Sequence, residues 1–85
     1  MYYVYVLKSK ANNDVYIGSA EDLRIRFTQH NNGEVKSTKG YRPWILVYYE
    51  AYKDKKDALM REKKLKMHAL KEDLKTRLHN SLLGA

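Results

Sequence analysis

The sequence predicts a small α+β domain with a three-stranded, antiparallel-type sheet flanked by helices, in the order β-β-α-β-α-(α). Two runs of aromatic and β-branched residues near the N-terminus are separated by a short turn. A third run lies in mid-chain, and the last third of the chain is helical in composition. The 85 residues suffice for one hydrophobic core, so we expect a single domain over residues 1–85.

The first two runs predict a β-hairpin. Tyr2–Lys8 reads YYVYVLK, and both of its alternating faces are apolar, which is typical of a central strand. The turn sequence SKANND follows it. The segment DVYIG then resumes the strand pattern, and this second strand is expected to end at Gly18.

A helix is expected next, within the segment SAEDLRIRFTQHNNG. Ser19 is the predicted N-cap, which places Glu21 and Asp22 in the first turn, where acidic side chains complement the helix dipole. Gly33 can adopt the left-handed conformation that commonly follows a helix end. The segment EVKSTKGYRP after it is expected to be a polar loop.

The second half of the chain predicts one strand and a long helical region. Trp44–Tyr52 reads WILVYYEAY and is the clearest strand, with Pro43 at its edge. Asp54 is the predicted N-cap of the helical region, with Asp57 three residues later as in a capping box. We expect a break or bend in the helix near Met67–Ala69.

Composition restricts the class of protein. The chain contains no cysteine, which excludes disulfides and thiolate zinc sites and is typical of a reducing compartment. No apolar run approaches the roughly 20 residues of a membrane helix, and the N-terminal segment lacks the features of a signal peptide. We therefore expect a cytoplasmic protein, or a nuclear one in a host with a nucleus, without a membrane partner.

The charge of the chain is strongly basic. The formal net charge is +7, and the segment Lys53–Arg77 supplies +5 of it, from ten Lys/Arg against five Asp/Glu. Eight tyrosines accompany this charge. Basic charge together with aromatic residues suits a phosphate-rich partner such as a nucleic acid. A charged helical surface that merely faces water is the alternative.

Two cationic or ionisable side chains lie beside the apolar stripe of the first predicted helix. Arg26 and His30 are four residues apart and neighbour Leu23 and Phe27, so they share one helix face. Either side chain could simply flank the stripe and reach solvent. Alternatively, the two line a concave phosphate site on the sheet.

Glu62 is the second polar residue in an awkward place. The expected packing positions of its helix are Ala58, Leu59, Leu65 and Ala69. Glu62 falls on the same face, and a carboxylate against a core is costly unless it is paired or bound to a cation. A pair with Lys66 at i+4 is the structural interpretation, and a bound cation is the functional one.

Taken together, four separated motifs resemble the GIY-YIG nuclease family, and most of all its small single-domain members. These motifs are YVY at Tyr3–Tyr5, YIG at Tyr16–Gly18, LRIRFTQHN, and ALMREKKLK. The resemblance extends from Tyr2 to about Lys66 and keeps the order, spacing and chemistry of the motifs. Singly, each of these residues also has an ordinary packing role.

The resemblance implies a role for each motif residue. Tyr5 is the tyrosine of the first motif, and Tyr16 is that of the second, the general base or base-assisting hydroxyl toward the attacking water. Gly18 lets the backbone turn tightly beside the site. Arg26 would stabilise charge on the scissile phosphate, and His30 would contact that phosphate or assist proton transfer.

The metal site and the outer contacts follow from the same resemblance. Glu62 would be the single protein ligand of Mg²⁺ or Mn²⁺, and Mg²⁺ commonly keeps several waters and takes substrate phosphate as well. Asn80 is the best match for a late asparagine of the family. Contacts with the nucleic-acid backbone are expected from Thr38, Lys39 and Arg42, although a solvated basic loop explains them equally well.

The sequence thus predicts a metal-dependent endonuclease that hydrolyses phosphodiester bonds in nucleic acid, with DNA favoured and DNA repair as the expected setting. No DNA-reading module is recognisable, so specificity would come from substrate shape, a protein partner or a homodimer. One alternative is a nucleic-acid-binding module of the same fold with weak or partner-dependent catalysis. Another is a small interaction domain that only keeps the fold.

Overall fold

The computed structural model describes residues 1–84 and has the predicted α+β fold. Its elements are β1 (Tyr2–Ser9), β2 (Val15–Ala20), α1 (Leu23–Asn31), a 3₁₀ turn η1 (Lys39–Tyr41), β3 (Trp44–Tyr52), α2 (Lys55–Leu65), α3 (His68–Arg77) and α4 (His79–Leu83). No helix within the described residues is both long and apolar enough to cross a membrane.

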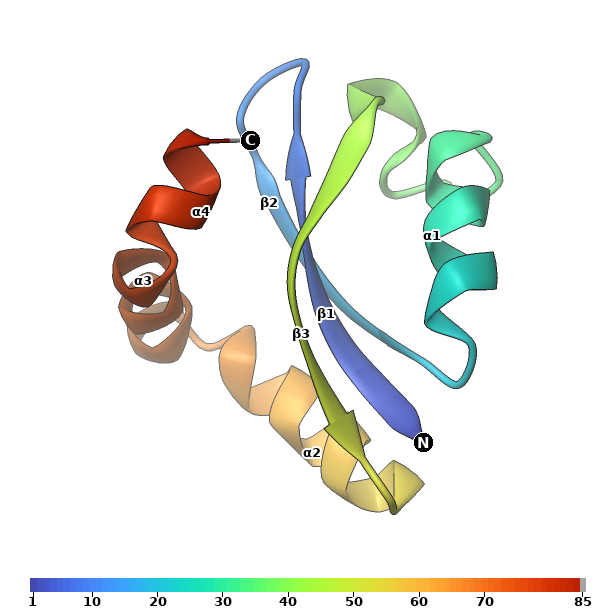
Figure 1. The fold of residues 1–85 in the computed structure, drawn as a ribbon, viewed down its shortest axis with the longest axis vertical. Coiled ribbons are helices and arrows are strands. Elements are labelled where there is room, and N and C mark those ends of the chain that lie inside the picture. Colours follow the sequence, from blue (N-terminus) through green and yellow to red (C-terminus); the bar gives the residue numbers. More distant parts are fainter. Residues whose placement is uncertain (85) are drawn as a thin grey trace.

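The three strands form one antiparallel sheet in the order β2-β1-β3, so β1 is central as predicted. Figure 1 shows α1 on one side of this sheet and α2, α3 and α4 on the other. Tyr5 in β1 lies opposite Gly18 of β2 and Tyr49 of β3. The centre of the sheet therefore carries the first tyrosine and the glycine of the two motifs side by side.

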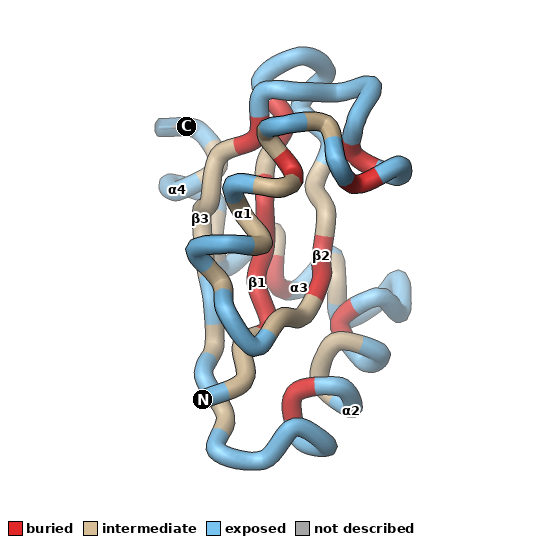
Figure 2. Tube along the Cα trace, turned by 90° about the vertical axis from the view of Figure 1, so that its right-hand side faces the viewer, coloured by how far each residue is buried: buried red, intermediate tan, exposed pale blue. Residues whose placement is uncertain are grey.

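Alternation along β1 builds a core on each side of the sheet. One core faces α2 and α3 and contains Val4, Val6, Ile17, Ala58, Leu65 and Leu74. The other core faces α1 and contains Tyr5, Leu7 and Trp44. Figure 2 shows that β1 is buried along most of its length. Because both faces of β1 are covered, its residues from Tyr2 to Leu7 are all aromatic or aliphatic.

The second strand continues past Gly18, contrary to the prediction. It ends at Ala20, and Ser19 pairs with Val4 across the β1–β2 ladder. Gly18 has no positive φ, so the expected tight turn is absent there. The prediction failed because the glycine was interpreted as a strand end, whereas it lies inside the strand and serves close packing.

The first helix begins later than predicted. Asp22, and not Ser19, is the N-cap: its carboxylate accepts a hydrogen bond from the backbone N–H of Ile25 at 3.0 Å. Glu21 and Asp22 therefore precede the helix instead of filling its first turn. At the other end, Gly33 has a φ of 77°, which confirms the predicted left-handed conformation.

The helical region begins and breaks where the sequence predicts. Asp54 caps α2 by accepting from the backbone N–H of Lys56 at 2.8 Å, and the chain leaves helical geometry between α2 and α3. Two of the four predicted packing positions are wrong, because Leu59 and Ala69 are exposed. Leu59 is rotated by about 100° from its buried neighbour, and Ala69 lies in α3, where the periodicity of α2 no longer applies.

Candidate active site

The two motif tyrosines meet on the α1 side of the sheet. Tyr5 is 1% exposed, Tyr16 is half-buried, and their ring centroids are 6.3 Å apart. A Cβ on Gly18 would lie 2.6 Å from the Tyr5 hydroxyl oxygen and 3.0 Å from Cε2 of Tyr16. Gly18 is therefore required because any side chain would displace the tyrosines. Gly18 is itself buried, whereas the sequence-based prediction placed it among the residues that contact nucleic acid.

His30 lies behind the tyrosines and is fully buried. Its Nε2 is 2.7 Å from the hydroxyl oxygen of Tyr5, and its Nδ1 is 2.7 Å from Oγ1 of Thr38. The ring packs edge-on against Tyr16, at 5.0 Å between centroids. Both ring nitrogens thus have partners inside the protein, so neither is free for the phosphate contact that was one of the two roles expected of His30.

The same burial corrects the expectation for Thr38. Its side chain is fully buried against His30, so it cannot contact a nucleic-acid backbone. The sequence predicts a polar loop here because Ser37, Lys39 and Gly40 surround Thr38. Nothing in that local pattern shows that the loop folds back over the end of α1.

Burial sets the protonation of both partners in this pair. Desolvation, with a smaller contribution from the Arg26 guanidinium, lowers the pKa of His30 to about 4. Desolvation and the neighbouring Tyr16 raise the pKa of Tyr5 to about 12, although Arg26 acts in the opposite direction. At neutral pH the imidazole is therefore uncharged and Tyr5 keeps its proton.

Arg26 lies at the outer side of this group. Its side chain is half-buried on α1, and Nη1 donates to Oε1 of Gln29 at 3.1 Å. Its charge affects the protonation of both Tyr5 and His30, so the guanidinium stands within electrostatic reach of both. A planar guanidinium in this place offers a two-pronged donor to phosphate oxygens.

Glu62 reaches the site from α2, on the opposite side of the sheet. Its Oε1 accepts from the hydroxyl of Ser19 at 2.5 Å, and its Oε2 accepts from the ammonium of Lys66 at 2.6 Å. Its negative charge contributes to the raised pKa of Tyr5, after the larger effects of burial and Tyr16. The predicted pair with Lys66 is present, and the charge of Glu62 acts on Tyr5 from across the sheet.

Ser19 is a site residue that sequence reasoning missed. In β2 it follows Gly18, so the two residues point to opposite faces of the sheet. Gly18 makes room for the tyrosines, while Ser19 holds the carboxylate of Glu62. Alternation along an unbroken strand would have indicated this, but the strand was expected to end one residue earlier.

The ligands available to a metal ion are few. Within residues 1–84, no three His, Asp, Glu or Cys side chains converge in a way that could hold a metal ion. Glu62 offers one carboxylate whose side chain is 19% exposed, with the Ser19 hydroxyl beside it. Hard oxygen donors of this kind suit Mg²⁺ or Mn²⁺ completed by water and phosphate, provided that Lys66 moves aside.

A cleft of about 530 Å³ opens between the sheet and the N-terminal end of α1. It is lined by Tyr3, Glu21, Asp22, Leu23, Arg24, Phe27, Leu46 and Tyr49. None of the five predicted catalytic residues lines it. Tyr3 and Tyr5 lie on the same face of β1, so the cleft is beside the tyrosine pair and not at it.

Comparison with known proteins identifies the family to which this arrangement belongs. The model of the GIY-YIG catalytic domain matches residues 1–77. The chain belongs to the GIY-YIG family. This is a nuclease family, and the resemblance in the four motifs is thereby confirmed.

The relatives of this GIY-YIG chain are small proteins of similar length. The UPF0213 protein of Staphylococcus saprophyticus is 40% identical over 75 residues, which cover 87% of this chain and 90% of the relative. The UPF0213 protein of Staphylococcus haemolyticus is 37% identical with the same coverage. The solution NMR structure of the UPF0213 protein from Bacillus halodurans has 32% identity and a TM-score of 0.56, covering 89% of this chain and 84% of that one.

The remaining predicted residues are Asn80, Lys39 and Arg42, and all three are exposed. Asn80 is exposed on α4, which lies across the sheet from α1, and it falls outside the matched range of 1–77. The structure therefore does not bring Asn80 to the tyrosines. Lys39 and Arg42 are exposed at η1, where Nε of Arg42 donates to the Lys39 carbonyl at 2.9 Å. Both remain accessible to a ligand.

Proposed function

We propose that this protein is a metal-dependent endonuclease that hydrolyses phosphodiester bonds in nucleic acid, most readily DNA. One observation carries the proposal: the rings of Tyr5 and Tyr16 lie 6.3 Å apart on the face of the sheet that α1 covers, and the charges of Arg26 and Glu62 both act on the pKa of Tyr5. These groups come from β2, α1 and α2, so three further elements bring charge or a hydroxyl within electrostatic reach of Tyr5 in β1. In phosphodiester hydrolysis a hydroxyl pair can orient water, a guanidinium can stabilise charge on the phosphate, and a carboxylate can hold a cation.

Each group has a distinct part in the proposed reaction. Tyr16 is half-buried, so its hydroxyl can reach and orient the attacking water. Arg26 binds the scissile phosphate and stabilises the charge that develops on it. Tyr5 remains protonated and is held in place by His30. His30 thus acts through Tyr5 and makes no contact with substrate.

Glu62 and Ser19 would hold the metal ion. When bound, Mg²⁺ or Mn²⁺ supplies positive charge for the phosphate oxygens and the leaving group. The hydroxyl of Ser19 fixes one carboxylate oxygen of Glu62, and the ammonium of Lys66 contacts the other. Lys66 is a flexible side chain at a half-exposed position, so it can withdraw when a cation binds.

A nucleic-acid-binding module with weak or partner-dependent catalysis is the second candidate. The contact between Lys66 and Glu62 favours it, because the ammonium at 2.6 Å neutralises the carboxylate without any metal. A phosphate could then bind near Arg26 while Glu62 stays paired. Under this proposal a protein partner or a second copy of the chain would supply both activity and specificity.

A cleavage assay separates the two candidates. Labelled linear, flapped, nicked and branched DNA and RNA are incubated with Mg²⁺, Mn²⁺ or EDTA. We expect metal-dependent cutting by the wild type and by Glu72→Gln, an exposed carboxylate on α3, but none by Glu62→Gln. Circular dichroism should show that both variants are folded. Binding without cutting under every condition would favour the second candidate.

A further inference from the structure

A chain of buried hydrogen bonds connects the loop before β3 to the centre of the sheet. Thr38 and His30 are 0% exposed, and Tyr5 is 1% exposed. Their polar atoms follow one another at 2.7 Å, from Tyr5 to Nε2 of His30 and from Nδ1 of His30 to Thr38. Thr38 lies outside the four family motifs, so the motifs do not explain why it takes part in this row of hydrogen bonds.

Thr38 is held in place independently of His30. Its carbonyl accepts from the indole N–H of Trp44 at 2.8 Å, and its backbone N–H donates to the carbonyl of Val35 at 3.1 Å. Trp44 is itself buried at the start of β3. The hydroxyl of Thr38 is therefore a fixed point against which the imidazole of His30 must orient itself.

A neutral imidazole has one N–H and one bare nitrogen, so the hydrogen bonds among Tyr5, His30 and Thr38 can be donated in either direction. Thr38 has one further acceptor within reach, the carbonyl of Val35, at 3.4 Å from Oγ1. That carbonyl can only accept. In one direction, Tyr5 donates to His30, His30 donates to Thr38, and Thr38 donates to the carbonyl of Val35. Each of these three donors then has an acceptor, although the bond from Thr38 to Val35 is long.

The opposite direction leaves a proton without a good acceptor. Thr38 would then donate to Nδ1, and Nε2–H would donate to Tyr5. The hydroxyl proton of Tyr5 would need another acceptor, but the neighbouring Arg26 guanidinium has only donors. Buried donors are nearly always satisfied in native proteins. The direction from Tyr5 toward Thr38 is therefore favoured.

We propose that Thr38 is a positioning residue: by accepting the Nδ1–H of His30, it keeps Nε2 bare, so that Tyr5 donates inward and turns its free lone pair toward the reacting groups. The effect of Thr38 on catalysis rests on the proposed nuclease function. The tautomer of His30 does not depend on that function. Tyr5 can thereby receive a hydrogen bond from the neighbouring Arg26 guanidinium, because its own proton is given to His30.

Nuclear magnetic resonance of the nitrogen-15-labelled protein at neutral pH tests the tautomer directly. The imidazole nitrogen shifts of wild-type His30 should show a protonated Nδ1 and a bare Nε2. Thr38→Val removes the acceptor, and the proton should move to Nε2. Thr38→Ser keeps the hydroxyl and should preserve the wild-type tautomer. A wild-type His30 protonated at Nε2 would overturn the proposal, whether or not the valine variant folds.

Cleavage kinetics test the catalytic consequence. Thr38→Val should lower kcat about tenfold and leave KM unchanged, because the loss of one correctly directed hydrogen bond has an effect of this size. Thr38→Ser should retain the wild-type kcat. Thr76→Val is the matched control, because Thr76 is exposed on α3. An unchanged kcat in Thr38→Val, with the tautomer moved, would refute the positioning role. Absence of cleavage by the wild type would instead refute the nuclease function, while the tautomer result stands.

Discussion

Arg26 and His30 lie one helical turn apart on α1, yet their side chains occupy opposite environments. Arg26 is half-buried at the outer side of the tyrosine group, whereas His30 is enclosed and hydrogen-bonded at both ring nitrogens. A guanidinium is always charged in proteins because its positive charge is delocalised. The imidazole loses its charge because burial and Arg26 lower its pKa. Arg26 and His30 therefore have different chemical roles, although they are neighbours on one helix face.

The buried imidazole predicts sensitivity to acid. Unfolded His30 takes up a proton near its ordinary pKa of 6.5, whereas folded His30 resists protonation down to about 4. Its contribution to stability is therefore complete above pH 6.5 and is lost as the pH falls toward 4. The free energy of unfolding should drop by about 3 kcal/mol over this interval from this group alone.

Urea denaturation from pH 7 to pH 4 measures this dependence. The variant His30→Gln can still hydrogen-bond but cannot take up a proton, so its stability should fall less steeply with pH. His79→Gln, an exposed histidine on α4, serves as the control and should follow the wild type. Parallel curves for the wild type and His30→Gln would show that His30 does not titrate in this way.

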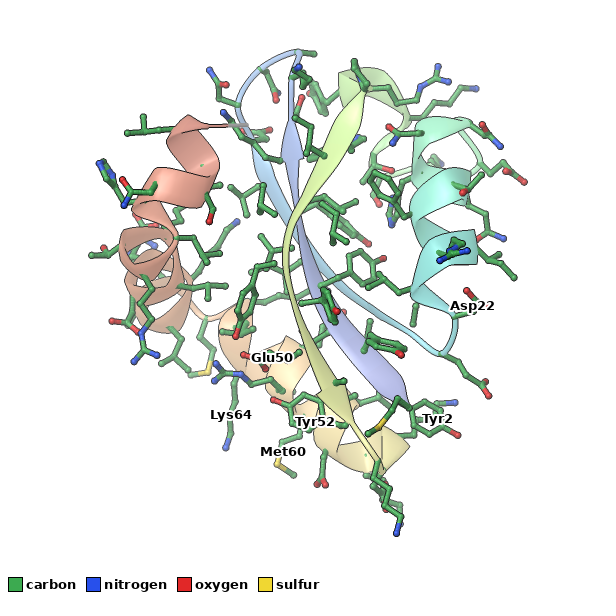
Figure 3. All side chains as sticks on the ribbon, in the orientation of Figure 1. Tyr2, Asp22, Glu50, Tyr52, Met60 and Lys64 are labelled. Carbon is green, nitrogen blue, oxygen red and sulfur yellow. The ribbon has the colours of Figure 1, made fainter. Side chains whose placement is uncertain are left out.

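At the scale of elements, a charged cluster attaches α2 to β3. The carboxylate of Glu50 accepts from Nε of Arg61 at 2.9 Å and from Nη2 at 3.1 Å, and also from the hydroxyls of Tyr48 and Tyr52. Figure 3 labels Glu50 and Tyr52 on β3, beside α2. Arg61 directly precedes Glu62, so this cluster sets the position of the helix that carries the candidate metal ligand.

Removing the charge of this cluster should destabilise the fold. Burial alone would raise the pKa of Glu50, but hydrogen bonds from Arg61 and the two tyrosines outweigh it and lower that pKa. Glu50→Gln leaves Arg61 without its partner and should cost about 1–3 kcal/mol. Asp73→Asn, which breaks the exposed pair with Arg77, should cost no more than about 0.5 kcal/mol. Equal urea midpoints for the two variants would contradict this ranking.

At the scale of the whole molecule, the positive charge and the candidate site are spread over different elements. Residues 53–77 carry +5 of the net +7, on the α2 and α3 side of the sheet. Arg26, by contrast, lies on the α1 side. A nucleic acid held by these charges would therefore contact more than one layer of the fold.

Binding carried by charge should weaken steeply with salt. If about four phosphates are neutralised, the affinity for DNA should fall roughly a hundredfold between 50 and 200 mM salt. Arg26→Ala should reduce the slope of log K against log salt by about one, because it removes one phosphate contact. Fluorescence anisotropy in EDTA measures both. An affinity that does not change with salt would exclude a phosphate-binding surface.

Much of the fold could be predicted because its signals are local. The strand Trp44–Tyr52, the left-handed Gly33 and the cap at Asp54 were all found, since each depends on side-chain alternation or turn chemistry over a few residues. The misplaced N-cap had a local cause as well. Serine and aspartate are both good N-caps, so local sequence does not distinguish Ser19 from Asp22. Ser19 is not the N-cap because it pairs with β1 as part of strand β2.

By itself, the sequence determined the order of the elements, the central place of β1 and the family, because periodicity and motif spacing are written along the chain. Only the tertiary structure decided that Thr38 lies beneath His30, that Ser19 holds Glu62, and that Asn80 stands apart. These facts depend on which segments distant in sequence cover one another. Burial of that kind sets the hydrogen bonds and pKa values from which the candidate site is built.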